Sequence, residues 1–291
     1  MIKGSIVALI TPFNEDGSVN FQKLSELLNW HIANSTDAIL VLGTTGESTT
    51  MTHEEDDAVV QFTLNTVKGR VPVIAGSGSN DTATQLMKSK KYADMGADAL
   101  LCITPYYNKA NEEGMIRHFT TVADQVSAPV ILYNVPGRTG CGLSVSAVER
   151  LSKHPNIMGI KEASGNISFA VSISRYLSDD FVMYSGNDDM IVPILSLGGS
   201  GVISVFANTN PKECHDLVWK WFEGDYAGSL AIQQKYLDYI HSLFLEVNPI
   251  PVKAALNAMG MEVGGYRLPL YEMSGRAAAV LYAEMEKVGL I

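Results

Sequence analysis

Short apolar runs alternate with longer segments of helical periodicity along most of this chain, and no other sequence feature constrains the fold as much. In the helical segments apolar residues recur every three or four positions, as Phe21, Leu24 and Leu28 do. This order predicts βαβ units and a parallel sheet. Most runs are apolar at successive positions, as expected of strands covered on both faces. Eight strands are predicted, at residues 5–10, 38–42, 72–75, 99–103, 129–134, 157–161, 181–185 and 201–204.

The number of alternations favours a closed barrel over an open sheet. Eight strand-helix units within roughly 220 residues are typical of a (β/α)8 barrel. An open, doubly wound sheet is the alternative, and the lack of a GxGxxG motif after the first predicted strand weakens it. Beyond about Glu223 the strand pattern stops and three helical segments follow. We therefore expect a (β/α)8 catalytic barrel over residues 1–224 and a helical extension, packed on the barrel, over residues 225–291.

Local signals predict where some of the helices begin. The segment Thr52-His53-Glu54-Glu55 has the form of a capping box, whose first and last side chains bond to each other's backbone amides. Two further segments, Asn210-Pro211 and Asn248-Pro249, each predict an N-cap residue followed by a proline at the first helical position.

Composition limits the kinds of partner. The formal net charge of -10 argues against nucleic acid, whose binding needs clustered lysine and arginine. No stretch approaches the roughly 18 apolar residues of a membrane helix, and Pro12 breaks an N-terminal run that does not resemble a signal peptide. Cys102, Cys141 and Cys214 are far apart and fit a reducing compartment without disulfides. We expect a cytoplasmic protein that acts on small molecules, with no membrane partner.

Lys161 stands out against the strand pattern. In a parallel barrel the chemistry lies at the carboxyl ends of the strands, and Lys161 ends the sixth predicted strand. If Ile160 faces the helices, the period of two turns Lys161 toward the barrel axis. In one interpretation the lysine is structural, and its charged end extends to the rim or pairs with a neighbouring acid. In the other interpretation the lysine is a desolvated, neutral amine that acts as a nucleophile.

Tyr133 favours the nucleophile. It lies at the same end of the neighbouring fifth strand, and Ile131 shares its face. The phenol and the amine would then be within reach of each other, and a barrel interior that excludes water favours a neutral amine. Glu162 follows Lys161 directly and should point the opposite way, so we do not assign it as the base.

The loops after the strands add groups suited to carboxylates. The sequence GTTGES at 43–48 combines glycines with two adjacent hydroxyls, although these residues are also common in turns. Arg138 follows the fifth strand, where a guanidinium can hold a substrate carboxylate through two hydrogen bonds. Pairing with a surface acid is the alternative for Arg138. Residues 104–108, TPYYN, place aromatic side chains at the barrel mouth.

Other motifs receive no catalytic role. The glycine-rich residues 198–201 precede the eighth strand and so belong at the opposite end of the barrel. The loop after the seventh strand, 186–189, is acidic and would repel phosphate, which argues against a phosphosugar enzyme or a pyridoxal phosphate lysine. Residues 76–80 are interpreted as a turn and a helix start. The histidines lack metal-ligand spacing, so we expect no metal.

Five motifs together resemble the bacterial dihydrodipicolinate synthase family, within the N-acetylneuraminate lyase superfamily of pyruvate aldolases. They are GTTGE at 43–47, TPYYN at 104–108, YNVPGRTG at 133–140, IKEASGN at 160–166 and SGNDD at 185–189. Each motif is weak alone. Their order and their positions at strand ends make the resemblance specific, and it runs from the first strand to the C-terminus.

The resemblance implies a reaction. Pyruvate would form a Schiff base with Lys161 and condense with L-aspartate 4-semialdehyde to give 4-hydroxy-tetrahydrodipicolinate. This is the committed step toward diaminopimelate and lysine, and it would need no cofactor. Tyr133, Thr44 and Tyr107 would relay protons, with Tyr107 supplied by a neighbouring subunit.

The resemblance also implies how the substrates are held. Thr45 and nearby backbone amides would bind the pyruvate carboxylate, and Arg138 would bind the carboxylate of the semialdehyde. Gly186 and Ile203 would line the pocket through backbone groups. The family's usual assembly is a homotetramer, which we expect here to be built from tight dimers.

Two other functions are considered. N-acetylneuraminate lyase and the keto-deoxy sugar acid aldolases share the barrel and the lysine, and Arg138 with the second threonine of GTTGE argues against them. A catalytically silent barrel that acts as a binding protein would not be expected to retain Lys161, Tyr133, Thr44, Tyr107 and Arg138 together.

Lysine-inhibited members of the family bind lysine at a subunit interface. Asp56 and Thr84 stand where those members carry histidine and glutamate, and Thr84 removes a carboxylate that would pair with the lysine ammonium. We therefore expect weak or absent feedback inhibition. Four residues still fit that pocket, which we interpret as vestigial: Ser48, His53, Asn80 and Tyr106.

Overall fold

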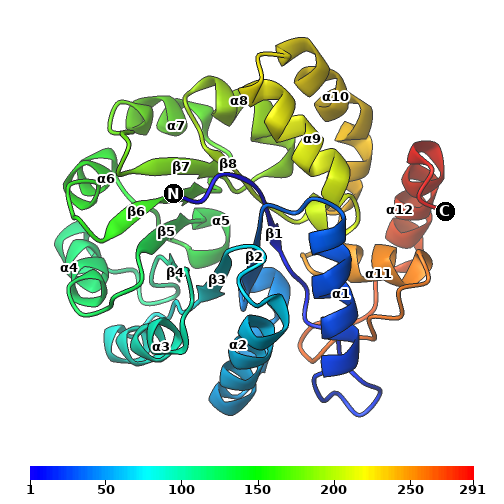
Figure 1. The fold of residues 1–291 in the computed structure, drawn as a ribbon, viewed down its shortest axis with the longest axis horizontal. Helices are drawn as coiled ribbons and strands as arrows, with labels where there is room; N and C mark the ends of the chain where they lie inside the picture. Colours follow the sequence, from blue (N-terminus) through cyan, green and yellow to red (C-terminus); the bar gives the residue numbers. More distant parts are fainter.

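The computed structural model describes residues 1–291, which form a closed barrel of eight parallel strands (Figure 1). The last strand pairs with the first, with Gly4 opposite Gly201, so the sheet has no open edge. The closed barrel confirms the predicted fold and excludes the open, doubly wound sheet. The strands are β1 (Gly4–Ala8), β2 (Ala38–Val41), β3 (Val73–Gly76), β4 (Ala99–Ile103), β5 (Val130–Asn134), β6 (Ile157–Glu162), β7 (Val182–Ser185) and β8 (Gly201–Ser204).

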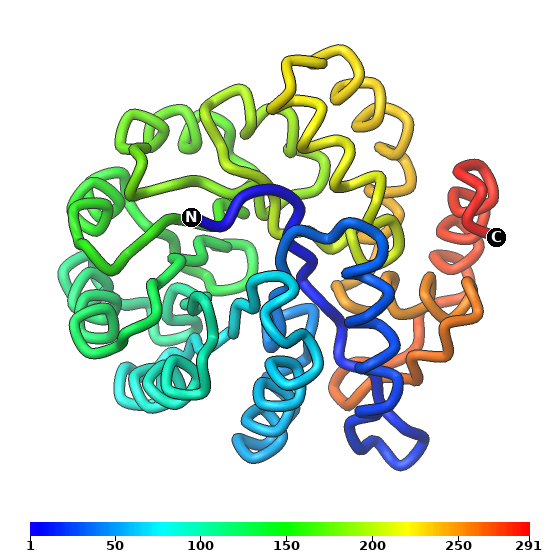
Figure 2. The backbone as a smooth tube through the Cα atoms, viewed as in Figure 1, coloured from blue at the N-terminus to red at the C-terminus, as the bar shows by residue number.

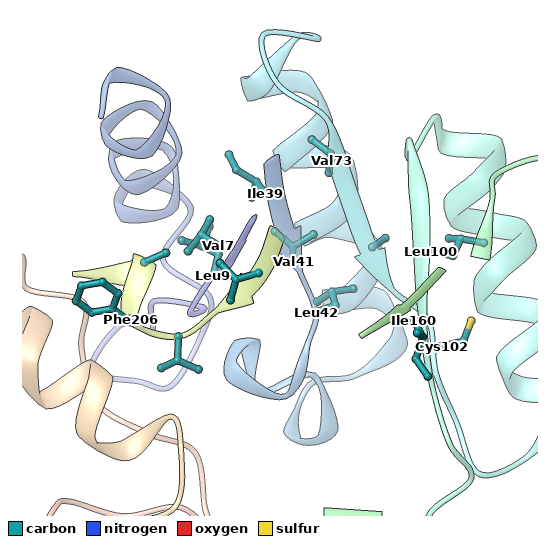
Figure 3. Close-up of a cluster of buried hydrophobic side chains, with 14 of the residues drawn as sticks. Val7, Leu9, Ile39, Val41, Leu42, Val73, Leu100, Cys102, Ile160 and Phe206 are labelled. Atoms are coloured by element: carbon teal, nitrogen blue, oxygen red, sulfur yellow. The ribbon is translucent and has the colours of Figure 1, made fainter. Parts of the chain in front are cut away.

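The strands are buried on both faces, which explains their continuous apolar sequences. Side chains that face the barrel axis, such as Ile6, Leu40 and Ile131, form an inner cluster. Alternate positions, such as Ile39 and Val41, belong to a larger outer cluster between the strands and the helices (Figure 3). This alternation determines which strand residues can reach the interior of the barrel.

Helices surround the strands, and three of them follow the eighth barrel helix, α9, as the predicted C-terminal extension (Figure 2). The N-terminus lies near the middle of the molecule in this view and the C-terminus lies at its periphery. None of the helices has the length and apolarity needed to cross a membrane. The helices are α1 (Phe21–Ala33), α2 (His53–Val67), α3 (Thr82–Met95), α4 (Glu112–Ala123), α5 (Pro136–Thr139), α6 (Val145–Leu151), α7 (Ile167–Ser174), α8 (Ile191–Ser196), α9 (Pro211–Phe222), α10 (Tyr226–Ser242), α11 (Ile250–Ala258) and α12 (Gly275–Val288).

Two of the three predicted helix starts are confirmed. The Thr52 hydroxyl accepts from the backbone amide of Glu55, and the Glu55 carboxylate accepts from that of Thr52, which completes the capping box at the start of α2. Asn210 is the N-cap of α9, and Pro211 is its first residue.

The prediction for the start of α11 was wrong. Pro249, not Asn248, is the N-cap, and the helix begins at Ile250. The physical reason is that the Asn248 side chain is bonded elsewhere: its amide donates to the hydroxyl of Thr45, across the molecule, at 2.9 Å. A capping pattern identifies a side chain able to cap a helix, and a competing long-range partner can take that side chain away.

Candidate active site

A cavity of about 170 Å³ lies at the carboxyl end of the barrel. A second cavity of about 290 Å³ shares Gly43, Thr44, Tyr133 and Arg138 with it, so the two adjoin. The carboxyl end is where parallel barrels place their chemistry. Six of the residues expected at the site line the smaller cavity: Thr44, Thr45, Tyr133, Arg138, Lys161 and Gly186.

Lys161 points into the barrel, as the strand periodicity predicted. Ile160, its neighbour in β6, belongs to the outer cluster, which leaves Lys161 on the inner face. Tyr133 is its direct partner on β5, and the Lys161 Nζ atom lies 4.3 Å from the centre of the Tyr133 ring. Both side chains are buried, yet both border the cavity. The amine and the phenol are therefore held together where a small substrate can meet them.

Lys161 differs from the other buried lysines in its charge partners. Lys88 and Lys253 are also buried, and each is paired with a carboxylate at 2.8 Å, Lys88 with Asp56 and Lys253 with Glu47. No salt bridge involves Lys161. The Lys161 amine therefore faces the cavity with no carboxylate bonded to it, where it can react with a substrate.

Glu162 points away from Lys161, as expected. Its carboxylate accepts from the side-chain amide of Asn134 and from the backbone amide of Ser164, both at 2.7 Å. Burial raises the pKa of Glu162, and the hydrogen bond from Asn134 opposes this shift. Both hydrogen bonds hold Glu162 in a structural role outside the cavity.

The loop after β2 presents Thr44 and Thr45 to the cavity. Thr44–Gly46 forms a short 3-10 helix, which the sequence did not predict, and Thr45 within it is buried. The Gly46 carbonyl accepts from the Thr11 hydroxyl at 2.6 Å. Glu47 ends the turn with a left-handed backbone, φ 55°. The two hydroxyls therefore lie on a loop held from several sides.

Arg138 lies at the mouth of the cavity in the short helix α5. Arg138 is exposed, and its Nη2 atom donates to the backbone carbonyl of Asn248 at 3.2 Å. No salt bridge occupies the guanidinium, so the structure does not support the alternative of pairing with a surface acid. The group keeps further donors for a carboxylate entering the cavity.

Tyr107 does not line the cavity of its own chain. The residue is 89% exposed, and its backbone is left-handed, φ 73°. A non-glycine residue in this region of φ carries a conformational cost, which is typical of functional positions. Tyr107 is thus presented outward from the loop after β4.

Gly186 and Ile203 differ in their relation to the cavity. Gly186 lines it, and a Cβ atom on this residue would lie 3.1 Å from the Lys161 Cε atom. Ile203 packs in the inner cluster of the barrel with an exposed fraction of 1% and does not line the cavity. The glycine-rich residues 198–201 lead into β8 at the opposite end of the barrel, where the Ser200 carbonyl accepts from the amide of Gly4.

Three of the four residues assigned to a lysine pocket gather beside the larger cavity. Ser48 and Tyr106 line it, and the Asn80 side chain donates to the Tyr106 carbonyl at 3.2 Å. His53 is exposed at the start of α2 and does not line the cavity. His53, unlike the other three residues, neither lines this cavity nor bonds through its side chain to a residue that does.

The segment that follows α10 contributes to the cavity, and no sequence pattern had predicted this. Phe244 and Asn248 line the cavity, although they lie about 110 residues beyond Arg138 in the chain. Lys253 was missed as well. A lysine in the otherwise apolar start of α11 was the available signal, and its partner Glu47 lies in the GTTGE motif.

The chain also matches a known protein family. The model of the Dihydrodipicolinate synthetase family matches residues 1–287. The chain belongs to this family. The family assignment agrees with the closed barrel, and the motifs that carried the resemblance lie in the loops that form the cavity.

Members of the dihydrodipicolinate synthetase family are similar to this chain along its whole length. A 4-hydroxy-tetrahydrodipicolinate synthase of Lachnoclostridium phytofermentans is 51% identical over 289 residues, which cover 99% of this chain and 98% of that protein. The crystal structure of dihydrodipicolinate synthase from Aquifex aeolicus is 42% identical, with a TM-score of 0.96, and covers 99% of this chain and 98% of that one. The chloride-inhibited dihydrodipicolinate synthase from Acinetobacter baumannii, complexed with pyruvate, is 39% identical, with a TM-score of 0.97, and covers 100% of both chains.

Proposed function

We propose that this chain is a lyase of the Schiff-base type that condenses pyruvate with L-aspartate 4-semialdehyde to give 4-hydroxy-tetrahydrodipicolinate. One observation carries the proposal: Lys161 is the buried lysine without an acidic partner, and it borders a cavity together with Tyr133 and Arg138. Full-length similarity to curated 4-hydroxy-tetrahydrodipicolinate synthases supports it. The reaction belongs to the synthesis of diaminopimelate and lysine.

The first half of the reaction activates pyruvate. The neutral Nζ of Lys161 attacks C2 of pyruvate, and the adduct loses water to form an imine. The imine draws electrons from the neighbouring methyl group, so a proton leaves C3 and an enamine forms. Tyr133 lies beside the amine and is placed to move protons in these steps.

The second half joins the two substrates. C3 of the enamine attacks the aldehyde carbon of the semialdehyde, whose oxygen takes up a proton. The amino group of the semialdehyde then attacks C2, closes the ring and displaces the Lys161 amine. Thr44 and Tyr107 complete the proton relay with Tyr133, and Tyr107 comes from a neighbouring subunit, in keeping with its outward position.

The substrates are held by their carboxylates. Thr45 and the backbone amides of its loop bind the carboxylate of pyruvate, and Arg138 at the mouth binds that of the semialdehyde. Gly186 lets the Lys161 side chain pass close to the backbone after β7. Ile203 supports the pocket from the inner cluster of the barrel.

We further propose a cytoplasmic homotetramer built from tight dimers. The exchange of Tyr107 between subunits needs one interface of twofold symmetry, which a dimer provides. Static light scattering of the purified protein measures this assembly directly, and a monomer at the concentration of the activity assay would contradict it.

We also propose that lysine inhibits this enzyme weakly or not at all. The Asp56 carboxylate is buried and held by Lys88 at 2.8 Å, so it is not available to a lysine ammonium. The Thr84 hydroxyl donates to the Asp81 carboxylate at 2.6 Å. Initial rates should change little when free lysine is added at about 1 mM, the upper end of common metabolite affinities. A clear loss of activity below that concentration would contradict the proposal.

A comparison of substrates tests the function. Purified protein is assayed with pyruvate and L-aspartate 4-semialdehyde by mass spectrometry of the product, and in parallel for cleavage of N-acetylneuraminate and of a keto-deoxy sugar acid. We expect condensation and no cleavage, and we expect Arg138→Ala to weaken the use of the semialdehyde far more than that of pyruvate. Cleavage of a sugar acid without condensation would identify a sugar-acid aldolase, and the lack of any turnover would leave a binding protein.

A further inference from the structure

Asn248 contacts both groups that are proposed to bind substrate carboxylates. Its side-chain Nδ2 atom donates to the Thr45 Oγ1 atom at 2.9 Å, and its backbone carbonyl accepts from Arg138 Nη2 at 3.2 Å. The residue is 5% exposed and lines the same cavity as Lys161. It belongs to the connection between α10 and α11, so one residue of the C-terminal extension joins two loops of the barrel.

The direction of the bond to Thr45 has a chemical consequence. A side-chain NH2 group is only a donor, so the Thr45 oxygen must be the acceptor in this contact. The hydroxyl proton of Thr45 is then free to be donated to another group. Threonine can donate only one proton, and a partner that accepted it would leave none for a substrate carboxylate.

This direction leaves the other polar atom of the Asn248 side chain without a partner. Its Oδ1 atom is buried and meets no donor in the protein. The reversed amide would direct this oxygen toward Thr45, where it would accept the hydroxyl proton. The observed orientation leaves an acceptor unpaired, which costs free energy. Functional sites can keep an unpaired polar atom of this kind when the orientation of the side chain helps to bind the ligand.

We propose that Asn248 is a positioning residue that keeps the Thr45 hydroxyl as a donor to the carboxylate of pyruvate. The inference rests on the proposed function, because it assigns Thr45 to pyruvate. The same residue limits the freedom of Arg138 through its backbone carbonyl, and a substitution of the side chain leaves that contact in place. The side chain and the carbonyl can therefore be tested separately.

The decisive variants are Asn248→Asp and Asn248→Leu, which are close to asparagine in size. Aspartate can only accept at neutral pH, so it would take the proton of Thr45 and place a negative charge near the substrate carboxylate. Leucine removes the contact without reversing it. We expect the pyruvate KM to rise by about tenfold or less in Asn248→Leu and by clearly more in Asn248→Asp, with smaller changes in kcat. Equal effects of the two variants, or a fall in kcat without a change in pyruvate KM, would overturn the proposal.

A double variant distinguishes a positioning role of Asn248 from a general loss of structure. Thr45→Val lacks the hydroxyl, so adding Asn248→Leu to it should raise the pyruvate KM no further. An additive rise would contradict the proposal even if Asn248→Asp does not fold. Thermal unfolding of each variant checks that it is folded.

Reduction with borohydride in the presence of pyruvate distinguishes this proposal from the function on which it rests. If wild-type Lys161 forms no pyruvyl adduct, the proposed function itself fails. If the adduct forms and the pyruvate KM is unchanged in both Asn248 variants, only the role of Asn248 is refuted.

Discussion

At the scale of single residues, the position of Lys161 depends on the space that Gly186 leaves beside it. A Cβ atom on residue 186 would lie 2.5 Å from the Cβ atom of Ala163 and 3.1 Å from the Cε atom of Lys161. Neither neighbour can move far, because Ala163 follows β6 directly and Lys161 is buried. The glycine is therefore part of the arrangement that holds the amine.

We predict that Gly186→Ala lowers kcat by about tenfold or more, because a displacement of the nucleophile by a fraction of an ångström is costly in catalysis. Steady-state kinetics with both substrates measures the change. Gly275→Ala is the matched control, since a Cβ atom there meets nothing within 4 Å and the residue lies at the start of α12. The control should retain wild-type rates, and equal rates in both variants would show that residue 186 does not constrain Lys161.

The importance of Lys161 could be predicted from the sequence because a strand has a fixed period. Ile160 and Lys161 fall on opposite faces, and the structure confirms this alternation. Lys88 and Lys253 were not predicted to be buried. Their carboxylate partners lie 32 and 206 positions away in the chain, and no local pattern relates residues so distant.

At the scale of secondary structure, the loop after β2 is fixed by a buried ion pair with α11. Glu47 ends the 3-10 helix that carries Thr44 and Thr45, and its carboxylate accepts from Lys253 at 2.8 Å. Neither side chain of the pair is exposed. Burial lowers the pKa of Lys253, and the charge of Glu47 opposes this shift. The Lys253 ammonium also donates to the Thr11 carbonyl at 3.1 Å.

We predict that Lys253→Met lowers the free energy of unfolding by about 3 kcal/mol or more, because it leaves the Glu47 carboxylate buried and unpaired. Urea unfolding followed by circular dichroism measures the loss. Lys287→Met is the control: Lys287 also pairs with a glutamate, but its side chain is 65% exposed, so the unfolding curve should not move. A similar small effect of both variants would contradict a structural role for the buried pair.

The elements themselves could be predicted well where burial is uniform. All eight strands lie within two residues of their predicted ends, because continuous apolar runs mark strands covered on both faces. The short 3-10 helix at Thr44–Gly46 was not predicted, since glycine and threonine also suit many turns. The start of α11 was misplaced because Asn248 bonds to Thr45, a contact that no local sequence pattern shows.

At the scale of the whole molecule, we propose that residues 225–291 act as part of the barrel. Asn248 and Lys253 from this extension bond to the loop that carries Thr45 and Glu47. Arg267, further along, forms hydrogen bonds with both carboxylate oxygens of Glu55 at 2.7 and 2.6 Å. The extension therefore supports one end of the site through direct bonds to the barrel. A domain that folded separately would not make these bonds.

The proposed exchange of Tyr107 between subunits predicts complementation. Tyr107→Ala and Lys161→Ala should each be almost inactive, because each lacks one group of the site. After the two are mixed and allowed to reassort, a mixed dimer has one site with both wild-type residues. We expect the mixture to recover up to about a quarter of wild-type activity per site, since about half of the dimers are mixed. No recovery, with reassortment verified by mass spectrometry of the dimers, would show that Tyr107 does not act across subunits.

The most direct test of the central claim is the trapping of a pyruvyl group on Lys161. The protein is incubated with pyruvate, reduced with borohydride, digested and analysed by mass spectrometry, alongside Lys161→Ala. We predict a pyruvyl adduct on the peptide that contains Lys161 in the wild-type protein, and none in the variant. An unmodified wild-type protein, or an adduct at another lysine such as Lys88 or Lys253, would contradict the Schiff-base mechanism.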